Sequence, residues 1–390
     1  MDQGQTVGDR IREARKRGGL SQRELARASG LSLSLISKLE QGERQDTRTE
    51  TLRKIAAVLS IPTTALIGGS PPPPMAAPEP AWEPVRRAIS SPAGCDQGAL
   101  EPVTEHGLTS ALAAAVKLYH DNRYSDLAVV LPRLLRDAED ASPLLRSRVL
   151  QLAGSLMVQT RQRDVARIAL DRSLADAQET GSTLDVASSI ITMCWLLLLE
   201  RRFAQVQETA LQWADRVEPK LSVASAAEVS TWGWLLLRAS AAAVRDNRPD
   251  DAAQIMRLAE AAAVSIGRDR GSYHSYWTTF GPATVAMKQV ENAVVSDDPR
   301  LALTLSARVP GSLRPTSDNR NRHLLDVTTA HLNLRQYPEA FDVLHQLARE
   351  APAWLQNQPA AKDLLAAIIG KRRTLTPQMR EVADAIRLPF

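Results

Sequence analysis

The chain has 390 residues, with 48 Lys and Arg against 44 Asp and Glu, 44% hydrophobic residues and 4% aromatic residues. This length predicts two or three domains, and a low aromatic content is typical of Ala- and Leu-rich helices. Two isolated cysteines, a polar start of the chain and no apolar run of membrane-spanning length argue against a disulfide-rich, secreted or membrane protein, so we expect a cytoplasmic one.

The first predicted elements are two short helices near the start of the chain. Apolar residues recur at helical spacing over residues 6–17 and predict the first helix. Ser21 is followed three residues later by Glu24, which is a capping-box pattern. A second helix is therefore expected to begin at Gln22.

A tight turn and a third helix follow. Gly30 lies where the chain must turn sharply, because glycine accepts a positive φ without a steric cost. Ser32 is a suitable cap for a helix whose inner face carries Ile36 and Leu39, and Gly42 is suited to ending it. The pattern predicts two helices joined by a tight turn.

Two more helices complete a small bundle over residues 1–67. Apolar residues recur from Leu52 to Leu59 and predict a fourth helix, and Pro62 begins a short fifth helix through Leu66. Five helices in this length can support a core of their own.

Residues 6–67, about one sixth of the chain, resemble the XRE family of helix-turn-helix domains, which has the lambda-repressor-like fold. The family's anchor positions are all present at the right offsets: Gln22, Ala26, Gly30, Ile36, Leu39 and the Glu40-Gln41-Gly42 ending. The resemblance implies a third helix that enters the major groove of double-stranded operator DNA.

The resemblance also implies which residues contact DNA. Phosphate contacts are expected from Gln22 and from nearby basic residues: Arg23, Arg27, Arg44 and Arg48. Base contacts are expected from the start of the recognition helix: Ser32, Leu33, Ser34, Ser37 and Lys38. Leu33 can only pack on a thymine methyl, and serines discriminate weakly, so phosphate contacts and DNA shape should carry much of the affinity.

The charge distribution supports a DNA-binding role. Residues 1–67 contain 12 Lys and Arg and 8 Asp and Glu, so the net charge of +4 of the whole chain lies in this segment. Such clustering is expected of a phosphate-binding domain. The alternative is a small bundle that only binds proteins, as in antitoxin-like relatives of the family.

Residues 68–102 are predicted to be a linker. They hold nine of the chain's 23 prolines, which favour an extended, semi-rigid spacer. Trp82, Val85 and Ile89 are unusual in such a segment. Two alternatives remain open: a partly disordered linker, or a short arm that docks Trp82 onto one of the domains.

Residues 103–390 alternate long apolar helices with short polar turns, and strand signals are absent, so we expect an all-α protein. The turns recur, and they align on these residues: Tyr124, Val165, Phe203, Pro249, Arg300 and Tyr337. Tyr337-Pro-Glu-Ala340 resembles the tetratricopeptide (TPR) repeat, although the spacing exceeds its period of about 34 residues. The resemblance implies a TPR-like α-solenoid of about six hairpins, followed by helices near 359–372 and 376–387.

Candidate ligand-binding residues lie on the expected inner face of this solenoid and in an aromatic cluster between Gly271 and Gly281. They are Trp195, Arg201, Tyr273, His274, Tyr276, Trp277, His331 and Arg335. A small, partly apolar effector or a protein helix suits such a surface better than an extended peptide. The alternative is that the cluster only fills a gap in irregular packing.

Motifs of common enzyme classes are missing: no Walker A sequence, no G-x-S-x-G, no H-E-x-x-H and no Rossmann glycine pattern. The histidines show no metal-ligand spacing, so neither an enzyme, a metal site nor a cofactor is expected. The sequence favours a homodimeric, bacterial-type transcriptional regulator whose TPR-like region senses an effector, dimerises, or both. The alternative is an antitoxin-like interaction protein whose N-terminal domain only autoregulates.

Overall fold

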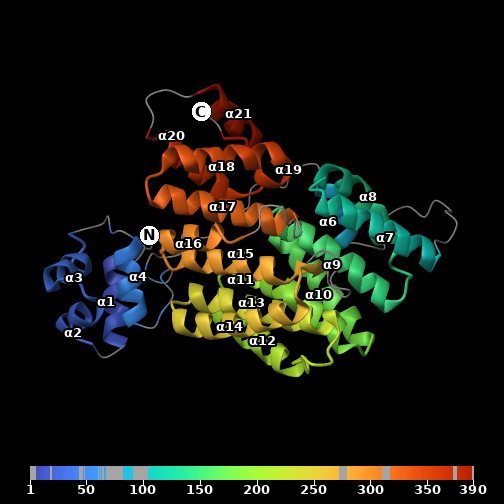
Figure 1. Cartoon of the computed structure of the whole chain (residues 1–390), viewed down its shortest axis with the longest axis horizontal. Coiled ribbons are helices and arrows are strands. Elements are labelled where there is room, and N and C mark those ends of the chain that lie inside the picture. The colour runs from blue at the N-terminus through green and yellow to red at the C-terminus, as the bar shows by residue number, and fades with distance from the viewer. Residues whose placement is uncertain are drawn as a thin grey trace.

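The computed structural model describes residues 6–17, 20–43, 47, 49–59, 61, 63, 66, 82–90, 104–271, 279–309, 317–371 and 376–388. These residues are almost entirely helical, so the expected all-α fold is confirmed (Figure 1). The head, which we define as the described residues from 6 to 66, contains α1 (Val7–Arg17), α2 (Gln22–Ser29), α3 (Leu33–Glu40) and α4 (Thr49–Val58). The expected helix from Pro62 to Leu66 lies for the most part outside the described residues.

The tail, residues 104–388 where described, is a stack of antiparallel helix pairs (Figure 1). The pairs are α7 (Glu105–His120) with α8 (Tyr124–Asp137), α9 (Pro143–Gln159) with α10 (Arg163–Glu179), α11 (Thr183–Leu199) with α12 (Phe203–Arg216), α13 (Ala226–Arg245) with α14 (Pro249–Ile266), α15 (Pro282–Val295) with α16 (Pro299–Ser306), and α17 (Ser317–Asn333) with α18 (Tyr337–Glu350). The short α19 (Pro352–Leu355) precedes α20 (Pro359–Ile369) and α21 (Pro377–Ala385), which match the two C-terminal helices expected.

The turns inside these six pairs share one backbone conformation. Each contains a non-glycine residue with φ between 55° and 64°, in the left-handed region: Asn122, Arg161, Arg201, Asn247, Asp297 and Arg335. The amide of the next residue donates to a carbonyl five residues back, as Arg202 does to Leu197 at 3.0 Å. This hydrogen bond is the helix-ending bond of the Schellman motif. The second helix starts directly afterwards, so every turn folds the chain back in the same way.

The common turn corrects the sequence alignment at two of its six positions. Since the second helices begin at Arg163 and Pro299, the anchors Val165 and Arg300 were placed two residues and one residue too late. The steps between successive left-handed residues are 39, 40, 46, 50 and 38 residues. Neither of these two helices begins with an aromatic residue, so the alignment had no equivalent of Tyr124 or Phe203 to follow.

Helix α6 (Glu83–Ser90) lies within the Pro-rich segment and packs on the tail. Trp82, Val85 and Ile89 are buried in the tail core, as the docking-arm alternative expects. The guanidinium group of Arg86 also donates to the Asp164 carboxylate at 2.7 and 3.1 Å. This part of the segment is therefore held on the tail by apolar and charged contacts together.

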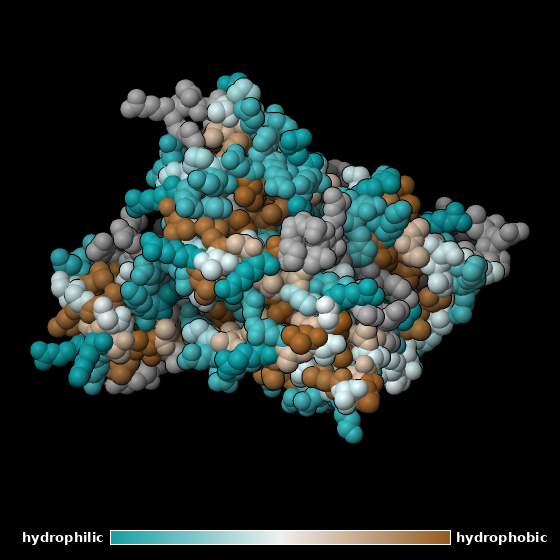
Figure 2. All heavy atoms as spheres, viewed as in Figure 1, coloured by the Kyte–Doolittle hydropathy of each residue, from teal (hydrophilic) through white to brown (hydrophobic). Residues whose placement is uncertain are grey.

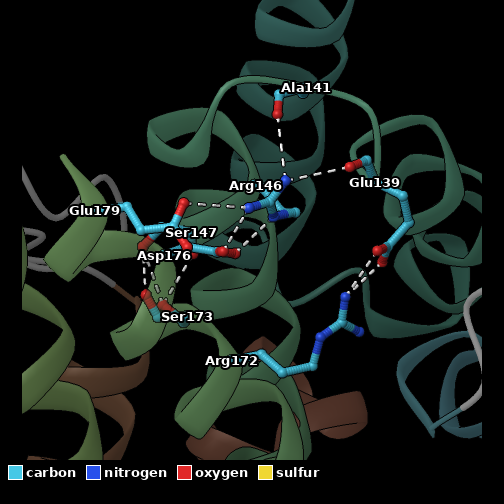
Figure 3. A network of polar contacts seen from close by, with 8 residues as sticks. All are labelled: Glu139, Ala141, Arg146, Ser147, Arg172, Ser173, Asp176 and Glu179. Carbon is cyan, nitrogen blue, oxygen red and sulfur yellow. Dashed lines mark hydrogen bonds and ion pairs between the residues drawn. The ribbon is translucent and has the colours of Figure 1, made fainter.

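Polar contacts join α9 to α10 (Figure 3). Ser147 and Ser173 each donate a hydroxyl hydrogen bond to the other's carbonyl, at 2.8 and 2.9 Å. Arg146 binds both oxygens of Asp176, at 2.9 and 2.7 Å. A Cβ at Gly154 of α9 would lie only 2.5 Å from the Leu170 side chain of α10. Small residues thus let the two helices approach closely, and the ion pair fixes their register.

The tail also contains a two-stranded antiparallel ribbon, β1 (Arg270–Gly271) with β2 (Thr279–Phe280), which the sequence did not predict. Phe280 is completely buried beside Gly233 of α13, where a Cβ would lie 2.1 Å from the phenyl ring. The glycine therefore makes room for the phenylalanine, and Trp234 donates its indole N–H to the Thr279 carbonyl at 2.9 Å.

Hydrophobic side chains reach the surface along the lower edge of the tail, over α12 and α14 (Figure 2). On α14, Leu258 is 49% exposed and Val264 is 77% exposed. The outer face of this helix is therefore less polar than that of a fully solvated helix.

Replacing Arg201 by glycine tests the turn conformation. An L-residue in the left-handed region costs about 1 to 2 kcal/mol, and glycine avoids this cost. The greater freedom of glycine in the unfolded chain offsets part of the gain. Arg201→Gly should therefore raise the unfolding free energy of the tail by up to about 1 kcal/mol, whereas Arg201→Val should lower it. The midpoint of urea unfolding reports both changes.

The neighbouring Arg202 is the matched control, since it is also exposed but has a φ of −86°. Arg202→Gly should give no stabilisation. An equal effect of glycine at the two positions would show that the turn conformation is not the cause.

Candidate DNA-reading surface and tail cavity

The turn between α2 and α3 follows local sequence signals at each step. The Ser21 hydroxyl accepts from the Glu24 amide at 3.2 Å, and the Ser21 amide donates to the Glu24 carboxylate at 2.7 Å. Gly30 has a φ of 65°, and the Ser32 hydroxyl caps α3 by accepting from the Leu35 amide at 3.2 Å. The capping box, the glycine turn and the second cap that the sequence predicted are all confirmed.

The two helices pack on a core of completely buried side chains, which include Leu25, Ile36 and Ile55. Gly8 of α1 lies against α3, where a Cβ would be 2.0 Å from the Leu39 carbonyl oxygen. Helix α3 thus packs on the head through the face that carries Ile36 and Leu39, and its outer edge is the one on the opposite side.

That outer edge of α3 is accessible. Ser32, Leu33, Ser34 and Lys38 are exposed, with Leu33 at 44%, and Ser37 is half-buried. Figure 1 places α3 at the end of the head that is remote from the tail. The basic residues Arg23 and Arg27 are exposed on α2, whereas Arg44 and Arg48 lie outside the described residues.

A buried carboxylate, Glu40, joins the three helices that form this surface. Arg15 of α1 donates to its two oxygens at 2.6 and 2.7 Å, and Gln22 of α2 donates at 2.8 Å. Arg12 donates to the Glu40 backbone carbonyl. Burial raises the pKa of Glu40, but hydrogen bonds from Arg15 and Gln22 outweigh it and hold the pKa below its ordinary value. The side chain is thus kept ionised in the interior.

Gln22 also has a structural role, because its side-chain amide donates to Glu40. The phosphate contact expected of it stays a prediction. Sequence reasoning found Glu40 only as part of a helix ending. The partner at Arg15 lies 25 residues away, and no local spacing connects the two.

The tail contains a cavity that is partly open to solvent. The first helix of every pair lines it, from α7 to α17. Contacts between the two ends of the stack close one side. Gln159 of α9 donates to Asp318 of α17 at 3.0 Å and accepts from Trp354 of α19 at 3.2 Å, and Arg161 donates to Gln358 at 2.9 Å. The stack thus forms a partly closed chamber.

Arg238 of α13 is the central charge of this chamber and is only 9% exposed. Its guanidinium carbon lies 5.0 Å from the ring centre of Trp234 and 5.7 Å from that of Trp195. Its Nε donates to the Ile191 carbonyl at 3.2 Å, and among the described residues no carboxylate forms an ion pair with it. Burial lowers the pKa of Arg238 to about 10, which still leaves it charged at neutral pH.

The other charged residues of the chamber are largely paired. Arg245 and Lys288 both bind the carboxylate of Glu291, at 2.5 and 2.7 Å. Burial raises the pKa of Glu291, but the charges of Lys288 and Arg245 hold it far below its ordinary value. Two further lining atoms, the Ser155 hydroxyl and one Asp318 oxygen, are buried without a hydrogen-bond partner among the described residues.

The predicted ligand residues are distributed differently from the expectation. Trp195 lines the chamber, but Arg201 and Arg335 occupy left-handed turns and are exposed. His331 is hydrogen-bonded to Gln336 at 2.8 Å and does not line it. The remaining four, Tyr273, His274, Tyr276 and Trp277, lie outside the described residues.

The TPR pattern, aligned on Phe203, predicts Cys194, Leu197 and Arg201 on the inner face of α11. Cys194 and Leu197 are buried between helices, whereas the next residues, Trp195 and Leu198, line the chamber. One residue corresponds to a rotation of about 100° around a helix. Burial raises the pKa of the Cys194 thiol to about 12, so this cysteine acts as a small core residue.

The described residues contain no group of three or more His, Cys, Asp or Glu placed to hold a metal ion. Among them there is also no helix with both the length and the hydropathy needed to cross a membrane.

The comparisons with known proteins concern the head. Residues 11–66 match the family described as Helix-turn-helix. A segment of 63 residues is 38% identical to RghRB of Bacillus subtilis strain 168, described as an uncharacterized HTH-type transcriptional regulator. That segment covers 16% of this chain and 45% of the relative. The chain therefore carries an XRE-type helix-turn-helix domain at its N-terminal end, and the match to the family ends before the tail.

Replacing Glu40 by glutamine tests the buried ion pair. The change leaves the Arg15 guanidinium without its carboxylate, and breaking a buried pair costs about 3 kcal/mol or more. We expect Glu40→Gln to destabilise the head by about 3 kcal/mol at pH 7. Thermal unfolding of the head, monitored through amide exchange in α1 to α3, measures this loss of stability.

The pH dependence supplies the control. A carboxyl with a lowered pKa stabilises the fold above its ordinary value of 4.5, and this stabilisation disappears as the pH falls through the lowered pKa. The difference between the two proteins should therefore shrink below pH 4.5. Glu24→Gln, which removes an exposed capping carboxylate, should cost much less. Equal losses at the two positions would contradict the role given to Glu40.

Proposed function

We propose that this protein is a cytoplasmic, homodimeric transcriptional regulator that binds operator DNA through its head. The exposed edge of α3, held by the buried Glu40 cluster in a helix-turn-helix domain, is the observation that carries this proposal. The tail is a TPR-like solenoid that senses an effector, dimerises, or both. The likeness of the head to an HTH-type transcriptional regulator of Bacillus subtilis supports this assignment.

The chemistry of the reading edge favours a dimer. Three of its five positions are serines, which make tolerant hydrogen bonds, and Leu33 offers only an apolar contact for a thymine methyl. Such an edge provides little discrimination between DNA sequences by itself. Two heads on half-sites about one helical turn apart would double both the phosphate contacts and the base contacts.

The double variant Leu33→Ala, Ser34→Ala tests the reading edge. It removes the methyl contact and one hydroxyl but leaves the buried face of α3 intact. We expect it to lose the preference for the selected operator, at about 1 to 3 kcal/mol per contacted base pair, and to keep non-specific binding. Selection from random DNA, followed by competition with scrambled sequence, measures the change.

Arg23→Ala serves as the contrasting variant, since an exposed phosphate contact carries no sequence information. It should weaken binding to all sequences alike and lower the salt slope by about one. Arg216→Ala, on the exposed surface of α12, should alter neither quantity. An unchanged operator preference in the Leu33 and Ser34 variant would refute the assignment of α3.

The head also contacts the tail, and it does so at two of the left-handed turns. Asn247 donates to the Ile61 carbonyl at 2.7 Å and accepts from the Thr63 hydroxyl at 3.1 Å. Arg53 of α4 lies 3.3 Å from the Asp297 carboxylate. These contacts support a role for the tail in setting the orientation of the head, in addition to sensing or dimerising.

Glycine substitutions at these two turns test that role. Asn247→Gly with Asp297→Gly keeps the backbone conformation and removes the side chains that hold the head. We expect faster amide exchange in α4 and a wider tolerance for the spacing between half-sites, because the heads are less restrained. Binding to operators with altered half-site spacing measures the second effect.

Arg201→Gly is the matched control, since it changes the same kind of turn at a place without a recorded contact to the head. It should leave the spacing preference unchanged. If the double variant also keeps the wild-type spacing preference, the tail does not set the orientation of the head.

A further inference from the structure

We propose that the tail chamber binds a small organic anion whose acidic group pairs with Arg238 and whose flat apolar body lies against Trp195 and Trp234. This inference names the effector class of the proposed sensing role and rests on that role only for its biological purpose. The binding chemistry itself follows from the described residues of the chamber.

The first argument is the state of Arg238. A buried guanidinium normally pairs with a carboxylate, because an uncompensated charge in the interior is costly. Arg238 instead makes one hydrogen bond to a backbone carbonyl and contacts two aromatic faces. Guanidinium groups bind carboxylate, sulfonate and phosphate in a two-pronged geometry. An acidic ligand group would supply the missing partner.

The second argument is the charge balance. The lining contains four basic residues and two acidic ones, and these are Arg238, Arg245, Lys288, Arg322, Glu291 and Asp318. Glu291 is engaged by Arg245 and Lys288. Asp318 already accepts from Gln159 through one oxygen. The six side chains sum to a net charge of +2: one positive charge remains in the group Arg245, Lys288 and Glu291, and one in the group Arg238, Arg322 and Asp318. This excess favours an anion over a neutral or cationic ligand.

The third argument is the shape and lining of the chamber. Leu198, Leu199 and Leu237 line the chamber together with the indole rings of Trp195 and Trp234. The chamber opens to solvent and combines apolar and aromatic side chains with few convergent polar groups, which is the lining typical of small-molecule sites. Since hydrogen bonds between α9, α17 and α19 close one side, an extended peptide could not run through the stack. A compact, flat, amphipathic anion fits all three conditions.

Two matched probes test the proposal on the full-length protein. Anilinonaphthalene sulfonate has a flat apolar body with one permanent negative charge, and phenylnaphthylamine has the same ring system without the charge. We expect the sulfonate to bind one site per chain, with quenching of tryptophan fluorescence. Arg238→Gln should weaken sulfonate binding about tenfold or more and change phenylnaphthylamine binding much less.

Three further variants keep the test decisive. Arg238→Lys retains the charge and should restore part of the sulfonate affinity, whereas Trp195→Leu should weaken both probes. Arg216→Gln is the control, because this exposed arginine lies 4.9 Å over the Trp213 ring on the outer helix α12, away from the chamber. Near-ultraviolet circular dichroism verifies that each variant is folded. If Arg238→Gln does not fold, Arg238→Lys and Trp195→Leu carry the test.

Equal sulfonate affinity in folded Arg238→Gln and wild-type protein would overturn the proposal, as would equal losses for the charged and the neutral probe. An unaffected Trp195→Leu variant would also overturn it. The outcome is independent of DNA binding. Loss of operator recognition with intact sulfonate binding would refute the regulator assignment alone, and the reverse result would refute the anion site alone.

Discussion

The turn conformation shared by the six helix pairs is the constraint on which the tail depends. Each pair ends its first helix with a residue in the left-handed region and the same hydrogen bond, so the chain reverses at the same angle each time. Because the angle repeats, the first helix of every pair faces the inside of the stack and the second faces outward. The chamber and its lining from α7 to α17 are direct consequences of this repetition.

The stability of the fold does not by itself explain why a charged side chain lies at the centre of the stack. Apolar side chains would fill the centre of such a stack at a lower cost than a guanidinium group does. The chain instead surrounds Arg238 with two tryptophans and leaves the hydroxyl of Ser155 without a partner among the described residues. Places where a sequence departs from the most stable choice are often those that carry function. In the head, by contrast, the buried Glu40 is fully paired, and its role there is to hold helices together.

The sequence predicted the features that depend on neighbouring residues and missed those that depend on distant ones. The caps at Ser21 and Ser32 and the glycine turn at Gly30 are local, and each was confirmed at the expected residue. The number of tail hairpins and most of their turns were also accessible, since polar turn residues interrupt apolar helices. The pairing of Arg15 with Glu40 could not be predicted, because the two residues lie 25 positions apart. The inner face of α11 could not be predicted either, because the rotation of a helix depends on how the whole stack coils. Arg238 is the one charged residue between Trp232 and Val244, a run that favours a buried helix, but only the closed stack shows what its guanidinium group faces.

Helices α13 and α15 connect the chamber to the head. On α13, Arg238 and Arg245 line the chamber, and Asn247, which binds the head at Ile61, follows Arg245 by two residues. On α15, Lys288 and Glu291 line it, and Asp297, the partner of Arg53, lies in the turn that follows. An α-helix transmits displacement along its axis with little loss over one or two turns, so a shift of either helix moves the surface on which the head rests. An effector changes DNA binding only if it prefers one of the resulting arrangements. Since α13 carries both Arg238 and a head contact, an anion bound at Arg238, as proposed above, would act on a helix that also contacts the head.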